Sequence, residues 1–99
     1  MQICNINLID EFSKQHPQFE KPLLALTQLI ELAQWQSAQD ISSTFSEVEK
    51  LDDERRVIFF KSVYSCVCVI VILKANILTI LEVLSYSEFS KREGKWPAN

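Results

Sequence analysis

The chain has 99 residues, of which 47% are hydrophobic and 23% are charged, and its net charge at pH 7 is −3. This length predicts a single domain over residues 1–99, and the composition is ordinary for a soluble globular protein. The weakly negative charge excludes the strongly basic surface of a protein that holds nucleic acid mainly through its phosphates.

The longest apolar stretch is too short for a membrane-spanning helix, which needs roughly 20 mainly apolar residues. Lys74 and Asn76 interrupt this stretch, and Glu82 lies within the next one. The N-terminus also lacks the basic region and the apolar segment of a signal peptide. We therefore expect a cytoplasmic protein that has no membrane partner.

The first half of the chain predicts a short strand followed by helices. Residues 2–6 alternate like a strand, and residues 8–15 carry apolar side chains at helical spacing up to the His16-Pro17 pair, because the residue before a proline disfavours a helix. Residues 17–36 have the widest apolar stripe and predict the longest helix. Residues 37–45 predict a loop and a short helical turn capped by its first serine.

The second half of the chain predicts strands. Residues 47–56 are charged and predict an exposed loop or a frayed strand start, residues 57–60 predict a strand, and residues 61–64 predict a turn. Residues 65–73 and 77–84 contain apolar runs rich in β-branched side chains, which fit a strand better than a helix. Since the first run does not alternate with polar residues, we expect its strand to be covered on both faces.

The segment Lys74-Ala75-Asn76 separates the two apolar runs and predicts a hairpin loop. The chain has one glycine, so we expect a longer loop rather than a tight turn with positive φ angles. Residues 85–93 predict a short final helix capped by Ser85 or Ser87. The whole order predicts an α+β fold, in which two N-terminal helices pack on a mainly antiparallel sheet and a short helix ends the fold.

The cysteines and the single histidine give little evidence for a catalytic or metal site. An odd number of cysteines (Cys4, Cys66 and Cys68) argues against a complete disulfide framework. Cys66 and Cys68 are two residues apart on a predicted strand, so they share a face, but no further ligand of suitable spacing accompanies them. We therefore predict buried thiols and neither a metal nor a cofactor.

Three strings in the chain have the order and spacing of a known family. Residues 12–17 read Phe-Ser-Lys-Gln-His-Pro, residues 33–41 read Ala-Gln-Trp-Gln-Ser-Ala-Gln-Asp-Ile, and residues 85–89 read Ser-Tyr-Ser-Glu-Phe. They resemble the Lys-His-Pro turn, the helix running into a Trp and an Asp-Ile pair, and the final Thr-His-x-Glu-Tyr string of the HigB toxins. These toxins belong to the RelE superfamily of type II toxin–antitoxin systems. The resemblance covers nearly the whole chain and implies a RelE-like fold.

The resemblance implies a ribosome-dependent mRNA endoribonuclease, or mRNA interferase, that inhibits translation. Its implied partners are mRNA on the ribosome and an antitoxin protein of the helix-turn-helix type. In the reaction, a ribose 2′-OH attacks the adjacent phosphate and the 5′-oxygen of the next nucleotide leaves. This chemistry requires a base, an acid and positive charge at the phosphate, and a strand arginine with a C-terminal histidine and tyrosine are the family's usual candidates.

The chain departs from the family pattern at these positions. The arginine position falls on Cys66, which removes a charge that binds phosphate through two hydrogen bonds. The histidine is replaced by Tyr86, whose hydroxyl is a better proton donor than base at neutral pH, and the tyrosine is replaced by Phe89. Glu88 matches the family string, and the loop before the arginine falls on residues 63–65.

By this resemblance the catalytic candidates are Tyr86 and Glu88. The candidates for RNA binding are cations of the second half, namely Arg55, Arg56, Lys61, Lys91 and Arg92. Each candidate also has a structural interpretation. Tyr86 suits an aromatic at the sheet edge, Glu88 suits the first turn of a helix, and the cations suit a solvated surface.

The joint replacement of arginine, histidine and tyrosine leaves two alternatives to an endoribonuclease. One is a catalytically inactive toxin homologue that serves as a protein-binding module for an antitoxin-like partner. The other is an ordinary α+β domain whose similarity to the toxins is accidental.

Overall fold

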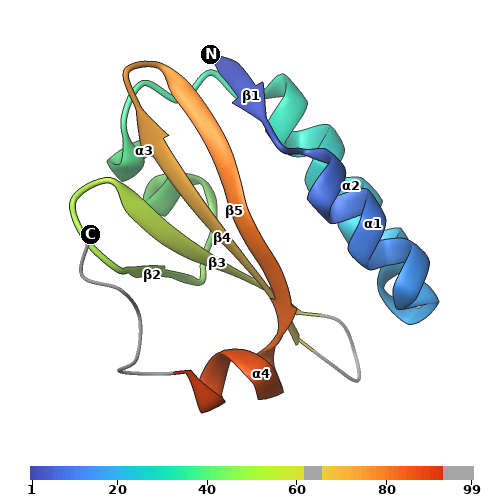
Figure 1. The fold of residues 1–99 in the computed structure, drawn as a ribbon. Coiled ribbons are helices and arrows are strands. Elements are labelled where there is room, and N and C mark those ends of the chain that lie inside the picture. The colour runs from blue at the N-terminus through green and yellow to red at the C-terminus, as the bar shows by residue number, and fades with distance from the viewer. Residues whose placement is uncertain (62–65, 93–99) are drawn as a thin grey trace.

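The computed structural model describes residues 1–61 and 66–92. Over these residues the chain forms an α+β fold with a five-stranded mixed sheet, which confirms the predicted fold class at this level (Figure 1). The elements are β1 (Gln2–Cys4), α1 (Asn7–Gln15), a 3₁₀ turn η1 (Pro17–Phe19), α2 (Glu20–Leu32), α3 (Ala38–Thr44), β2 (Val48–Lys50), β3 (Arg55–Lys61), β4 (Cys66–Lys74), β5 (Ile77–Ser85) and α4 (Tyr86–Lys91).

The strands lie in the order β1-β5-β4-β3-β2. The strand β1 runs parallel to β5, and the other neighbouring strands are antiparallel, as the prediction of a mainly antiparallel sheet required. In Figure 1, α1 and α2 lie together on one side of the sheet, whereas α4 lies below the end of β5. The predicted short final helix is therefore confirmed as α4, which ends at Lys91.

The central strand β4 is buried on both faces, as its continuous apolar run predicts. Val69 and Val71 pack in the core beneath the helices α1 and α2. Cys68 and Ile70 point to the opposite face and pack with Phe89 of α4. Because successive side chains of a strand alternate between its faces, one strand contributes to two apolar clusters.

The longest predicted helix is shorter than its apolar stripe suggests. The turn η1 occupies residues 17–19, α2 ends at Leu32, and Ala33 has an extended backbone with φ −69° and ψ 149°. The extended segment carries Trp35 into the core, where it is 5% exposed and its Nε1 donates to Oγ1 of Thr44 at 2.8 Å. None of the helices in the described part of the chain is both long enough and apolar enough to cross a membrane.

The predicted helical turn after this segment is the two-turn helix α3. Ser37 occupies the N-cap position, but its side chain makes no capping hydrogen bond. Instead, Oδ2 of Asp40 accepts a hydrogen bond from the backbone N–H of Gln36 at 2.8 Å. The carboxylate of the first turn therefore anchors the residue just before the helix, which is not the role expected of the serine hydroxyl.

The charged region before the sheet contains a strand that the prediction missed. The strand β2 pairs with β3 through Val48 opposite Ile58. It is three residues long and lies at the edge of the sheet, so it offers too few side chains for a recognisable alternation. The strand β3 includes both arginines before residue 57, which agrees with the predicted alternative of a strand start in this region, and it extends one residue beyond the prediction to Lys61. Residues 62–64 of the predicted turn and residues 93–99 lie outside the described residues.

The hairpin between β4 and β5 is tighter than predicted. Lys74 pairs with Ile77, so only Ala75 and Asn76 form the turn. Both have positive φ angles, 52° and 63°, as type I′ turns require. The expectation of a longer loop was therefore wrong, because the pairing of two long apolar strands outweighs the roughly 1 kcal/mol that a left-handed alanine costs.

Candidate functional site

Five side chains of the described residues line a hollow of about 380 Å³ at the end of the sheet beside α4. They are Glu47, Phe59, Lys61, Cys66 and Tyr86. They come from the segment before β2, from β3, from β4 and from the first position of α4. Residues far apart in the sequence are thus collected at one place by strand pairing.

The register of the strands explains this collection. Lys61 at the end of β3 is opposite Cys66 at the start of β4. The next residue of β4, Val67, is opposite Ser85, and α4 follows Ser85 without a loop. Phe59 has the same parity as Lys61 and belongs to the apolar cluster on the face opposite α1 and α2. The hollow is therefore on that face.

Lys61 and Glu47 form an ion pair at the mouth of the hollow. The distance from Nζ of Lys61 to Oε2 of Glu47 is 2.9 Å, and the two side chains are 61% and 46% exposed. The hydrogen bond and the charge of Glu47 raise the pKa of Lys61, so its ammonium is charged at neutral pH. Because both side chains are solvated, the pair adds little to stability and stays accessible to a ligand.

The thiols beside Lys61 are neutral at neutral pH. Burial raises the pKa of Cys66, and the charge of Lys61 only partly opposes this effect. Burial also raises the pKa of Cys68 to about 12. Cys66 therefore does not replace the positive charge that the toxin resemblance places at this position. Cys68 is fully buried, as predicted, whereas Cys4 and Cys66 are half-buried.

An aromatic cluster holds Tyr86 at the hollow. The ring of Phe59 lies edge-on to Tyr86 at 6.1 Å and to Phe89 at 5.5 Å, measured between centroids. Such edge-to-face pairs are favourable arrangements of aromatic rings. Tyr86 is 50% exposed, whereas Phe89 is 3% exposed. The ring at the tyrosine position of the family string is therefore a core residue, and the ring at the histidine position is the accessible one.

The remaining candidates on α4 do not line the hollow. The Ser85 side chain accepts a hydrogen bond from the backbone N–H of Glu88 at 3.3 Å, which confirms Ser85 as the N-cap. Glu88 and Lys91 are exposed in the first and last turns. Nη1 of Arg92 donates to both carboxylate oxygens of Glu82, and this contact raises the pKa of Arg92.

The two arginines at the start of β3 are buried, so the interpretation of them as solvated cations was wrong. Arg55 is 9% exposed, and its Nε donates to Oδ2 of Asp52 at 2.6 Å. Hydrogen bonds from the side chain and backbone of Arg55 hold the pKa of Asp52 below its ordinary value. Arg56 is 4% exposed and donates to Oγ of Ser42 at 3.0 Å and to the Asp52 carbonyl at 2.6 Å.

The two arginines also lie far from Lys61, another of the predicted RNA-binding cations. Arg55 pairs with Ile72 near the hairpin, whereas Lys61 pairs with Cys66 at the other end of the same strand. Six residues of extended strand span about 20 Å. Of the five predicted RNA-binding cations, only Lys61 therefore lines the hollow.

Two residues of the hollow, Glu47 and Phe59, were missed. Glu47 lies in the charged region that was expected to be an exposed loop or a frayed strand start, just before the unrecognised strand β2. The signal was the alternation of Glu47 and Glu49 around Val48, which puts both carboxylates on the face opposite the core. Phe59 was predicted to lie in a strand, but the face of the sheet to which its side chain points was not predicted.

The hollow offers an ammonium, a carboxylate and a phenol to a ligand. The ammonium of Lys61 suits a phosphate oxygen, the carboxylate of Glu47 can accept a proton, and the hydroxyl of Tyr86 can donate one. Among residues 1–61 and 66–92 there is no group of three or more histidine, cysteine, aspartate and glutamate side chains that suits a metal ion.

Comparison with known proteins assigns no family. No model of a known protein family matches the chain, and no curated protein is significantly similar to it in sequence.

Proposed function

We propose that the chain is a HigB-like toxin of the RelE superfamily, a ribosome-dependent mRNA endoribonuclease. The observation that supports this most is the lining of one hollow by Lys61, Cys66 and Tyr86. Cys66 and Tyr86 stand where the resemblance puts the catalytic arginine and histidine. Two helices on one side of a mainly antiparallel sheet, with a short final helix, also agree with a RelE-like fold.

The proposed chemistry divides three tasks among three side chains. Glu47 accepts the proton of the 2′-OH, whose oxygen then forms a bond to the adjacent phosphorus. Lys61 binds a non-bridging phosphate oxygen and stabilises the added negative charge. Tyr86 gives its proton to the 5′-oxygen as the P–O bond breaks. The products are a 2′,3′-cyclic phosphate and a free 5′-hydroxyl. Water then carries the proton from Glu47 to Tyr86, which restores both groups.

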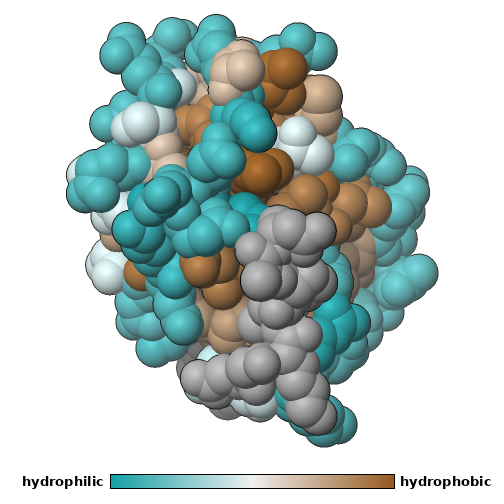
Figure 2. Space-filling view, turned by 60° about the vertical axis from the view of Figure 1, so that its left-hand side comes forward, coloured by the Kyte–Doolittle hydropathy of each residue, from teal (hydrophilic) through white to brown (hydrophobic). Residues whose placement is uncertain are grey.

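A catalytically inactive homologue that binds an antitoxin-like protein is the second candidate. Glu47 partly neutralises Lys61, and the described residues of the hollow include neither an imidazole nor a guanidinium. Figure 2 brings the left-hand side of Figure 1 forward and shows apolar side chains in the middle of this face, with hydrophilic side chains around them. A surface of this mixed kind suits a protein partner.

Cleavage of mRNA during in vitro translation tests the first candidate. We expect the native chain to cut the message and leave 2′,3′-cyclic phosphate ends, and we expect Tyr86→Phe and Glu47→Gln to cut it far more slowly. Lys74→Met is the matched control, because Lys74 is an exposed cation at the opposite end of β4. Intact message at a large excess of the native chain would refute the endoribonuclease.

A growth assay separates the two candidates. Arrest on expression that disappears in Tyr86→Phe or Glu88→Ala supports the endoribonuclease, and it also tests the predicted catalytic role of Glu88. Absence of arrest, together with a stable complex with a small helix-turn-helix protein encoded beside this chain, supports the binding module. If neither arrest nor complex is observed, both candidates are wrong.

A further inference from the structure

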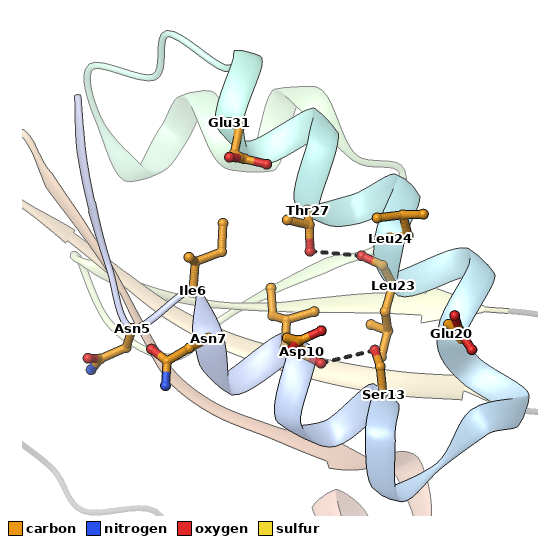
Figure 3. Close-up of a pocket in the computed structure, with 11 residues that line it drawn as sticks. Asn5, Ile6, Asn7, Asp10, Ser13, Glu20, Leu23, Leu24, Thr27 and Glu31 are labelled. Carbon is orange, nitrogen blue, oxygen red and sulfur yellow. Dashed lines mark hydrogen bonds between the residues drawn. The ribbon is translucent and has the colours of Figure 1, made fainter.

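A second hollow, of about 430 Å³, lies between α1 and α2 on the other side of the sheet from the Lys61 hollow. Figure 3 shows that its walls come from these two helices and from the segment that joins β1 to α1. We call it the helix groove. The residues that line it are Asn5, Ile6, Asn7, Ile9, Asp10, Ser13, Glu20, Leu23, Leu24, Thr27 and Glu31.

The two walls of the helix groove are regular stripes. Ile6, Asp10 and Ser13 are spaced by four and three residues along α1 and its N-cap. On α2, the positions 20, 24, 27 and 31 are spaced by four, three and four residues. Residues at this spacing lie above one another on one face of a helix. The groove therefore runs along two helices and has the shape that accepts a third.

The floor of the helix groove is apolar and one wall is exposed. Ile9 and Leu23 are 1% and 0% exposed, whereas Leu24 is 57% exposed. The hydroxyls of Ser13 and Thr27 donate to carbonyls of their own helices, at 3.0 Å and 2.9 Å (Figure 3). Since these hydroxyls use their protons within their helices, the polar groups that remain in the lining are three carboxylates and the amides of Asn5 and Asn7.

The charge of the helix groove is negative. Glu20 and Glu31 stand on one wall and Asp10 on the other. Asp10 has a partner in Lys14, with a distance of 3.1 Å from Nζ to Oδ2, but none of the described residues that line the groove is a cation. A second copy of the chain docked through this face would place like charges together, which disfavours that pairing. Charge complementarity favours a cationic partner.

We propose that the helix groove binds an amphipathic helix of another protein, with an apolar stripe flanked by lysine or arginine. The 13 residues of α2 give a wall about 20 Å long, which matches about four turns of a partner helix. Apolar anchors at positions i, i+4 and i+7 would fill the floor beside Leu24, and the flanking cations would meet Glu20 and Glu31. This inference does not rest on the proposed nuclease function, and both hollows can be occupied together because they lie on opposite sides of the sheet.

Binding of a designed helix tests this inference. The probe is a fluorescent, side-chain-stapled peptide of about 15 residues, with leucines at i, i+4 and i+7 and lysines on both sides. A second peptide has glutamate in place of every lysine. We expect the purified native chain to bind the lysine peptide at low salt and to bind the glutamate peptide at least tenfold more weakly.

Variants of the chain locate the binding site. Leu24→Asp and the double variant Glu20→Lys/Glu31→Lys should each weaken binding about tenfold. Leu32→Asp controls for an exposed leucine of α2 outside the groove, and Glu49→Lys/Asp53→Lys controls for the same change in net charge. Both controls should bind like the native chain, and circular dichroism should show that all variants are folded.

Three results would overturn the inference. The first is failure of the native chain to bind the lysine peptide, and the second is equal binding by groove and control variants. The third is a dimer of the native chain, detected by light scattering, that Leu24→Asp abolishes while Leu32→Asp does not. That last result would assign the groove to a second copy of this chain.

Discussion

The cations at the two ends of β3 differ in burial and in their partners. At the start of the strand, Arg55 and Arg56 are buried and bonded to neighbouring side chains and carbonyls. At the end of the strand, Lys61 is exposed and paired with one carboxylate in a hollow. The comparison teaches that burial and partners, rather than charge, separate a cation that holds the fold from one that a ligand can reach.

The largest effect on stability should come from Arg56→Ala. Its guanidinium donates to Oγ of Ser42 and to three carbonyls at or just before the start of β3, so its removal takes a donor away from several part-buried or buried oxygens. We expect the free energy of unfolding to fall by about 3 kcal/mol, as measured by urea denaturation. Lys74→Ala should change it by less than about 0.5 kcal/mol. A similar small change for Arg56→Ala would remove the distinction between the two ends.

Lys61→Met should give the opposite result, with a large loss of activity and little loss of stability. In the proposed reaction, the phosphate then loses the positive charge that Lys61 supplies in the hollow. We expect message cleavage to slow about 100-fold, which corresponds to about 2.7 kcal/mol of transition-state stabilisation. The urea midpoint should stay within error of that of the native chain. An unchanged cleavage rate would show that this end of β3 is no more functional than the other.

A smaller effect is expected from Ala75→Gly, at the hairpin near the buried arginines. Ala75 has a φ of 52°, which glycine adopts without a steric penalty. We expect the free energy of unfolding to rise by about 0.5–1 kcal/mol, because relief of the left-handed alanine outweighs the added freedom of the unfolded chain. Calorimetry measures this as a higher Tm. Cleavage should be unchanged, and any change in it would connect the hairpin end to the site.

The smallest effect on stability at neutral pH is expected from the titration of Cys68, which changes the free energy of unfolding only at high pH. Its pKa is raised to about 12 by burial, so the folded chain keeps this proton at a pH where the unfolded chain has lost it. The stabilisation is complete below the unfolded pKa, near 9, and is lost as the pH rises toward 12. We expect a slope of at most about −1.4 kcal/mol per pH unit in the free energy of unfolding. The free energy of unfolding should fall less steeply with pH in Cys68→Ala than in the native chain. An equal slope would show that Cys68 does not cause the pH dependence.

Long apolar runs made the sheet predictable, whereas short and charged segments hid the rest. The β-branched run of β4 identified a strand covered on both faces, and the serine before α4 identified its cap. The strand β2 has only three residues, and a strand this short has no period to detect. The burial of Arg55 and Arg56 depends on carbonyls and on Ser42, which are brought near by folding. The charges of these two arginines therefore predicted exposed side chains, whereas the fold buries them.

The membership of the Lys61 hollow was predictable only in part. Cys66 and Tyr86 followed from the toxin resemblance, and Lys61 followed from the excess of cations in the second half of the chain. Glu47 required the register of an edge strand that the sequence does not reveal. The pairing of Glu47 with Lys61 is a contact between strands, and local patterns contain no information about such contacts.

The parallel pairing of β1 with β5 joins Gln2 to Ile77. During synthesis, β1 has no partner strand until β5 has been made, and loop closure over such a distance slows folding. The nascent chain therefore completes its sheet only after β5 has emerged from the ribosome. A chain that attacked ribosome-bound messages would in this way be inert until its first strand had paired.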